Sequence, residues 1–133
     1  DTKAISQFIR KGIAGEDIVL KSAGDQLYSY TYVADAVSGL LTILLCGEKG
    51  EAYNIADTAS DLTLRELAEL IASFAGKKVV FELPDDVESA GYSKATKARL
   101  DGSKLRGLGW KPFYEISEGM QRTLRILKDT EQG

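Results

Sequence analysis

The residues best suited to binding chemistry in this sequence are basic, and they gather towards its C-terminal end. Between residues 92 and 111 a single acid, Asp101, accompanies six basic residues: Lys94, Lys97, Arg99, Lys104, Arg106 and Lys111. Ammonium and guanidinium groups attract phosphate oxygens, and arginine can donate two parallel hydrogen bonds to one phosphate. A site for a phosphorylated ligand and a solvated basic surface both fit this pattern.

The residues that most catalytic sites need are missing. The sequence has no histidine, which excludes a Ser-His-Asp triad, a Cys-His pair and a zinc site with histidine ligands. No tyrosine is followed by lysine at the spacing Tyr-x-x-x-Lys. The glycines at 12–15 and 102–109 adjoin predicted helices rather than joining a strand to a helix, so they do not form a dinucleotide loop. No complete catalytic set and no metal site are therefore predicted.

Composition indicates a globular protein, with 44% hydrophobic and 28% charged residues. The net charge of −3 argues against a nucleic-acid partner. The single cysteine, Cys46, cannot form an internal disulfide, so a cytoplasmic location is expected. The longest apolar run, residues 40–46, is much shorter than the roughly 20 residues that span a bilayer, so no membrane partner is expected.

The elements that must position the basic segment can be placed from periodicity. Apolar residues at helical spacing predict a helix over residues 3–13. Residues 17–21 and 27–33, separated by a turn-rich loop, predict a β-hairpin. Asp35 stands where an N-cap belongs, ahead of a leucine-rich helix that is expected to be buried and to end at Gly47, next to a buried Cys46.

Further elements follow along the second half. Residues 51–56 predict a short strand, and Thr63 with Glu66 predicts a capping box at the start of a helix that Gly76 ends. Residues 79–83 predict another strand. Asp101 is expected to cap a short helix containing Leu105 and Leu108, and Ser117 to cap the last one. The pattern predicts one compact α/β unit of about five helices.

Five stretches, taken in order, resemble the C-terminal half of the extended short-chain dehydrogenase/reductase family of NAD-dependent epimerases and dehydratases. They are YSYTYVADAVSGLL (28–41), GEAYNIAD (50–57), TLRELAELIA (63–72), ARLDGSKLRGLGWKP (98–112) and EGMQRTL (118–124). Each stretch alone is weak, but the ordered set covers nearly the whole chain.

This resemblance implies a fold and a division of labour. The fold would be the C-terminal part of a Rossmann-type enzyme, with a small mixed sheet, the hairpin and about five helices. Residues 1–133 would form a single substrate-binding domain. NAD would be bound by an N-terminal half that also carries Tyr-x-x-x-Lys, and no cofactor is expected on this chain. The partner would be a nucleotide-diphosphate sugar, UDP- or dTDP-linked, as in a nucleotide-sugar epimerase or dTDP-glucose 4,6-dehydratase.

The resemblance also implies substrate contacts. Arg99, in an R-x-D-like stretch, and nearby Lys97 would approach the diphosphate, while Leu20 and Lys21 would lie along the nucleobase. Tyr28 stands where relatives commonly place a phosphate-binding arginine, and it can donate one hydrogen bond but no charge. Ordinary strand packing or a solvated basic face remains the alternative for each.

Three functional interpretations remain open. The chain is the nucleotide-sugar-binding part of a longer enzyme, inactive alone, or a free-standing module that binds a nucleotide-sugar or another phosphorylated ligand, or a purely structural or partner-binding domain. In the first case, open strand edges or an exposed apolar patch make self-association of the isolated part an expectation.

Overall fold

The structure is a computed structural model that describes residues 3–83, 85 and 97–132. Its α-helices are α1 (Ala4–Ile13), α2 (Val33–Cys46), α3 (Leu64–Ala75), α5 (Ser103–Arg106) and α6 (Ile116–Gln132). A 3-10 turn spans Thr58–Ser60. The predicted α/β class and the number of helices are confirmed for the described residues. None of the described helices is long and apolar enough to cross a membrane.

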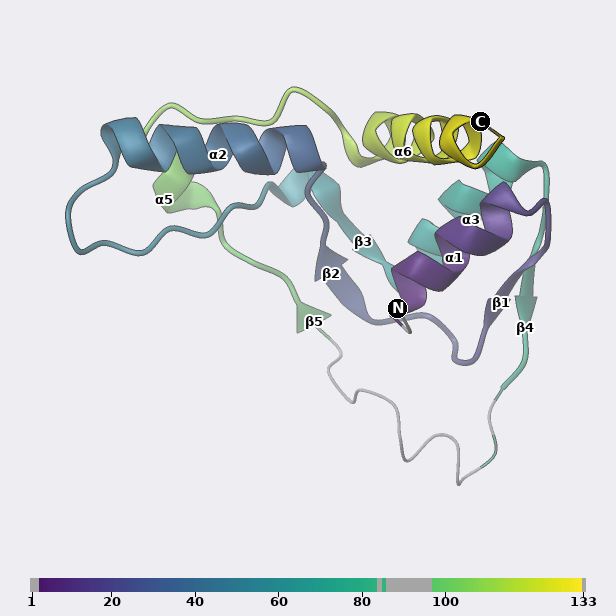
Figure 1. The fold of residues 1–133 in the computed structure, drawn as a ribbon. Coiled ribbons are helices and arrows are strands. Elements are labelled where there is room, and N and C mark those ends of the chain that lie inside the picture. Colours follow the sequence, from purple (N-terminus) through teal and green to yellow (C-terminus); the bar gives the residue numbers. More distant parts are fainter. Residues whose placement is uncertain (1–2, 84, 86–96, 133) are drawn as a thin grey trace.

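The five short strands in the described part of the chain form two separate sheets (Figure 1). Strand β1 (Ile18–Leu20) pairs in parallel with β4 (Val79–Phe81). In the other sheet β2 (Leu27–Ser29) lies between β3 (Asp61–Thr63), which is antiparallel to it, and β5 (Lys97–Ala98), which is parallel to it. The second sheet is therefore the predicted small mixed sheet.

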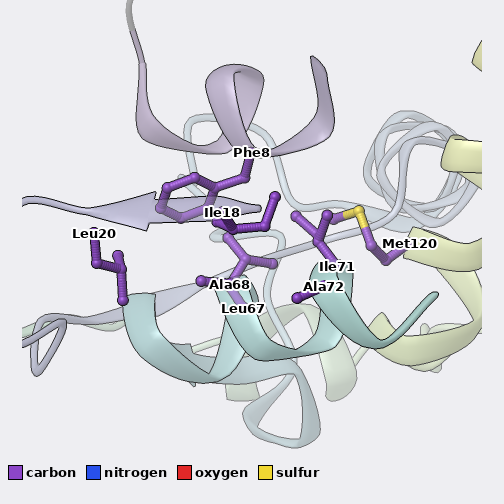
Figure 2. Close-up of a cluster of buried hydrophobic side chains, with 8 residues drawn as sticks. All are labelled: Phe8, Ile18, Leu20, Leu67, Ala68, Ile71, Ala72 and Met120. Atoms are coloured by element: carbon purple, nitrogen blue, oxygen red, sulfur yellow. The ribbon is translucent and has the colours of Figure 1, made fainter. Parts of the chain in front are cut away.

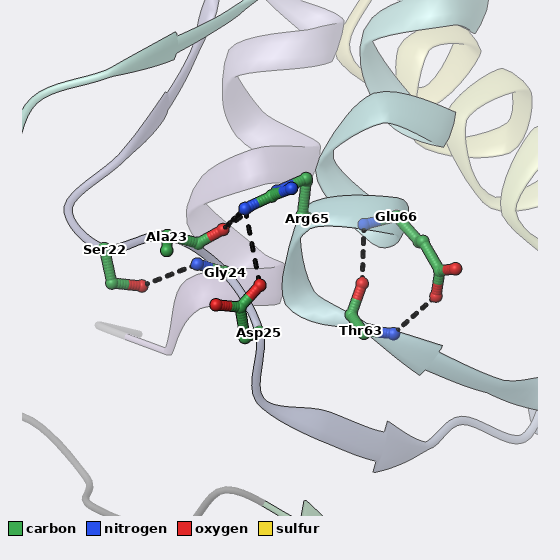
Figure 3. A network of polar contacts seen from close by, with 7 residues as sticks. All are labelled: Ser22, Ala23, Gly24, Asp25, Thr63, Arg65 and Glu66. Carbon is green, nitrogen blue, oxygen red and sulfur yellow. Dashed lines mark hydrogen bonds and ion pairs between the residues drawn. The ribbon is translucent and has the colours of Figure 1, made fainter.

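The predicted β-hairpin is wrong, because its two strands belong to different sheets. The start of α3 separates them by binding the loop between them (Figure 3). The Arg65 guanidinium donates to the Ala23 carbonyl and to Asp25, and the Arg65 amide donates to the Gly24 carbonyl at 2.9 Å. The loop's polar groups are thus satisfied by α3, and each strand finds a partner elsewhere.

The core lies where α1, β1, α3 and α6 meet (Figure 2). The fully buried side chains there include Ile18, Leu67 and Ile71, and burying each stabilises the fold by roughly 1.5–3 kcal/mol. The whole cluster is Phe8, Ile18, Leu20, Leu67, Ala68, Ile71, Ala72 and Met120. This core fixes β1, which is a strand of one sheet, and α3, which begins directly after strand β3 of the other sheet.

Helix α3 begins and ends as its sequence predicts. Thr63 accepts from the Glu66 amide at 3.1 Å, and the Glu66 carboxylate accepts from the Thr63 amide at 2.7 Å, which completes the capping box (Figure 3). Gly76 ends the helix with a φ of 66°, in the left-handed region that glycine tolerates best.

Helix α2 is oriented opposite to the prediction. Its outer face carries six large apolar side chains that are all exposed, with Leu44 at 77% and Leu45 at 81%: Val33, Val37, Leu40, Leu41, Leu44 and Leu45. The side turned to the rest of the chain carries the buried Asp35 and Gly39. A Cβ on Gly39 would lie 2.9 Å from the Ile55 side chain, so glycine permits this close approach. Cys46 is also exposed, not buried.

Three local predictions are corrected. Asp35 is not the N-cap of α2, because Tyr32 holds that position and the Asp35 carboxylate has other donors. Ser117 lies inside α6, which begins at Ile116. Residues 51–56 form no strand, because no described segment pairs with them.

Candidate functional site

Three of the five predicted site residues lie at the β2–β5 strand pair, although not on one face of it. Tyr28 lies in β2 and pairs in register with Ala98, Lys97 pairs with Leu27, and Arg99 directly follows β5. Because paired residues share a face and successive side chains alternate, Lys97 and Arg99 belong to the face of Ser29. Tyr28 belongs to the opposite face.

The orientation of Tyr28 agrees with its aromatic contact. Its ring lies edge-on to that of Tyr30, with centroids 6.2 Å apart, and Tyr30 packs against the core. Burial, and secondarily the neighbouring Tyr28, raises the pKa of Tyr30 to about 12. The hydroxyl of Tyr28 therefore does not share a face with the Arg99 guanidinium, and a role for it at the substrate stays a prediction.

The other two predicted residues lie at the β1–β4 sheet: Leu20 is the last residue of β1 and Lys21 directly follows it. The Leu20 side chain is 1% exposed and forms part of the core, while its carbonyl accepts from the Glu82 amide at 2.8 Å. The exposed Lys21 ammonium donates to the Glu82 carboxylate at 3.2 Å. The structure therefore places these two residues on a different sheet from Lys97 and Arg99.

Arg99 is exposed and faces a buried acid. Its side chain is 59% exposed, and its Nε lies 3.9 Å from Oδ2 of Asp61, whose side chain is 8% exposed. Asp61 Oδ1 accepts from the Ser29 hydroxyl at 2.7 Å, and the Ser29 oxygen accepts from the Leu100 amide at 2.8 Å. The guanidinium is thus near a fixed carboxylate while most of its surface faces solvent.

Two other residues of the basic segment are already paired with acids. Lys104 binds Glu51, which raises the pKa of Lys104 and lowers that of Glu51. Arg106 binds Asp57, whose side chain is 12% exposed. Sequence reasoning missed these partners because Glu51, Asp57 and Asp61 lie far from the segment in the chain. Lys104 and Arg106 are therefore less available to a ligand than the sequence suggests.

A separate depression of about 670 Å³ lies beside this ion pair. One wall is the segment 109–115, which α2 holds in place: Asp35 accepts from the amides of Phe113 at 2.7 Å and Tyr114 at 3.1 Å, and Ser38 accepts from the Trp110 indole at 2.9 Å. The role of Asp35 is thus structural. No group of three or more His, Cys, Asp or Glu in the described part of the chain could hold a metal ion.

Comparison with known proteins relates this chain to a family of enzymes. The model of the NAD dependent epimerase/dehydratase family matches residues 1–56. UDP-glucuronic acid decarboxylase 6 of Arabidopsis thaliana is 32% identical over 125 residues, which are 90% of this chain and 34% of that protein. The chain is thus similar to members of the NAD-dependent epimerase/dehydratase family, and the resemblance predicted from the five stretches is confirmed.

Solved structures of epimerases and dehydratases share the fold. UDP-glucose 4-epimerase of Thermotoga maritima, solved with UDP-glucose, superposes with a TM-score of 0.79 at 26% identity, covering 97% of this chain and 40% of that one. dTDP-glucose 4,6-dehydratase of Bacillus anthracis, solved with NAD, gives 0.80 at 22% identity, covering 98% and 40%. The chain thus spans about two fifths of the length of these epimerase/dehydratase chains.

Proposed function

We propose that this chain is the nucleotide-sugar-binding part of an NAD-dependent nucleotide-sugar epimerase or dehydratase, and that Arg99 contacts the diphosphate of a UDP- or dTDP-linked sugar. The observation that carries the proposal is an exposed arginine fixed at the end of β5. A charge-assisted hydrogen bond from such a guanidinium to phosphate contributes roughly 1.5–3 kcal/mol. Similarity to a UDP-sugar decarboxylase and to an epimerase solved with UDP-glucose supports the ligand class.

The residues of this chain that the structure describes do not fit NAD. The glycines with positive φ in the described residues are Gly15, Gly24, Gly50, Gly76 and Gly109. None of them stands in a glycine-rich loop that joins a strand to a helix. Gly24 follows β1, but a Cβ there would meet the Arg65 backbone at 2.9 Å, so α3 closes against this turn. We assign NAD and the catalytic pair to another part of the complete enzyme, and we expect no turnover by this chain alone.

The outer face of α2 favours a longer enzyme over a free-standing module. A helix that presents six large apolar side chains to water is typical of a surface that another part of the protein covers. Ile55 packs against Gly39 on the inner side of the same helix, and the segment 51–56 lacks a strand partner among the described residues. Since the chain spans about two fifths of the solved chains it matches, the remaining part of such an enzyme is the proposed cover.

Binding of UDP to the complete protein tests the ligand site. Calorimetry should show that Arg99→Ala weakens UDP binding by about tenfold or more, because the phosphate loses a positively charged hydrogen-bond donor. Lys111→Ala is the matched control, since it removes an exposed cation from the same basic segment but outside the β2–β5 strand pair. Unchanged affinity in the Arg99 variant, or an equal loss in both variants, would contradict the assignment of the site.

A further inference from the structure

Asp61 is a buried carboxylate with only one of its oxygens hydrogen-bonded within the described structure. Oδ1 accepts from Ser29 at 2.7 Å, while Oδ2 is buried without a hydrogen-bond partner. Among the described residues, the cation that forms an ion pair with Oδ2 is Arg99, with its Nε at 3.9 Å. Burying a charge without compensation is costly, so this carboxylate requires the guanidinium beside it.

Ser29 ties the carboxylate to the backbone that carries Arg99. Ser29 and Asp61 are register partners of the antiparallel β2–β3 pair, which fixes both on one face. The same hydroxyl that donates to Asp61 accepts from the Leu100 amide at 2.8 Å. The Arg99 backbone is therefore held on one side by the Ala98–Tyr28 pairing and on the other by Ser29.

We propose that Asp61, together with Ser29, is a positioning residue that holds the Arg99 guanidinium in place to bind the diphosphate; this inference rests on the proposed function. Asp61 approaches the guanidinium at Nε, and no other acid in the described residues forms an ion pair with Arg99. This geometry leaves the Nη groups of Arg99 to bind phosphate oxygens. An arginine has many rotamers, so restricting them before the ligand arrives strengthens binding.

An opposing effect sets the size of the expected change. The Asp61 charge repels a phosphate, and removing the charge would by itself strengthen binding. The carboxylate is almost fully buried and faces the cation directly, whereas the phosphate would lie beyond the guanidinium and be screened by it and by solvent. Positioning therefore outweighs repulsion, and removal of the Asp61 charge weakens binding.

A double-mutant cycle in the complete protein, with UDP as the probe, tests this inference. Asp61→Asn keeps an acceptor for Ser29 and removes the charge, and it should weaken UDP binding about threefold to tenfold. In an Arg99→Ala background the same substitution should change affinity less than twofold, because Asp61 acts through Arg99. Asp57→Asn is the matched control, because Asp57 is another largely buried acid paired with an arginine, Arg106. Its affinity should equal that of the wild type.

The outcomes separate the two proposals. If the wild type does not bind UDP, or Arg99→Ala binds it as tightly as the wild type, the proposed function fails and this inference fails with it. If Arg99→Ala weakens binding but Asp61→Asn does not, or weakens it equally in both backgrounds, only the positioning role is overturned. Should Asp61→Asn unfold, Ser29→Ala breaks the same link from the other side and must show the same dependence on Arg99.

Discussion

At the scale of single residues, Tyr30 makes stability depend on alkaline pH. Burial raises the pKa of Tyr30 to about 12, whereas an unfolded tyrosine titrates near pH 10. The folded protein therefore disfavours the phenolate. The stability that Tyr30 contributes is complete below about pH 10 and is lost as the pH rises from there towards 12.

Replacing Tyr30 with phenylalanine should remove this dependence. Urea unfolding followed by circular dichroism at pH 8 and pH 11 should show a smaller loss of unfolding free energy in Tyr30→Phe than in the wild type. Measurement at pH 8 also establishes that the variant is folded. Equal losses between the two pH values in both proteins would show that Tyr30 is not the residue responsible.

The role of a side chain could be predicted only where the group that it binds lies close to it in the sequence. The basic segment was recognised from its composition, but its acids were not, because Glu51 and Asp57 reach Lys104 and Arg106 through the fold. Asp35 was predicted as a helix cap from its position. Its true partners, the amides of Phe113 and Tyr114, lie 78 and 79 residues away. The predicted substrate contacts of Arg99, Lys97, Tyr28, Leu20 and Lys21 stay predictions.

At the scale of elements, the capping box of α3 stabilises more than its own helix. Thr63 is both the N-cap of α3 and the last residue of β3. It also pairs in register with Leu27 of β2. The cap therefore fixes the point where the mixed sheet joins the core helix.

Thr63→Ala should lower the free energy of unfolding by about 1 kcal/mol, because the Glu66 amide loses its side-chain acceptor. Chemical denaturation measures the change. Glu69→Ala is a suitable control, since Glu69 is exposed on the same helix and should alter stability by less than about 0.5 kcal/mol. A Thr63→Ala variant as stable as the control would mean that the cap contributes nothing.

Elements were predictable to the extent that their signals are local. The capping box and Gly76 define α3 within its own residues, and the structure agrees with both. The hairpin failed because strand pairing is decided at a distance: β1 pairs with β4, across 61 residues from Ile18 to Val79. The prediction of a strand over residues 51–56 is wrong for a related reason, since a segment forms a β-strand only when another strand pairs with it.

At the scale of the whole molecule, α2 was predicted correctly as a helix but wrongly as buried. The sequence predicts that its leucines lie in the core, because an apolar stripe on a helix usually faces the protein interior. In the structure α2 lies with α5 at one end, whereas α1, α3 and α6 group at the other (Figure 1). The buried residues on its inner side, Asp35 and Gly39, are polar or small. The outer face is therefore where α2 can bury further apolar area.

This outer face should make the isolated chain self-associate. Complete burial of an exposed leucine contributes roughly 1.5–3 kcal/mol, so contact between two such faces has a substantial driving force. Sedimentation should show concentration-dependent association of residues 1–133, and Leu44→Lys with Leu45→Lys should abolish it without loss of stability, because both side chains are already exposed. Leu83→Lys is the matched control, at 74% exposure and away from α2.

The same preparation links association to the proposed division of the enzyme. The monomeric double variant should show no turnover of UDP-glucose with NAD, because the catalytic pair and the cofactor are assigned to another part of the protein. A monomeric wild-type chain, or equal association in the double variant, would contradict the view that the outer face of α2 is an interface. Turnover by the isolated chain would contradict the division itself, because residues 1–133 would then contain both the catalytic groups and the cofactor site.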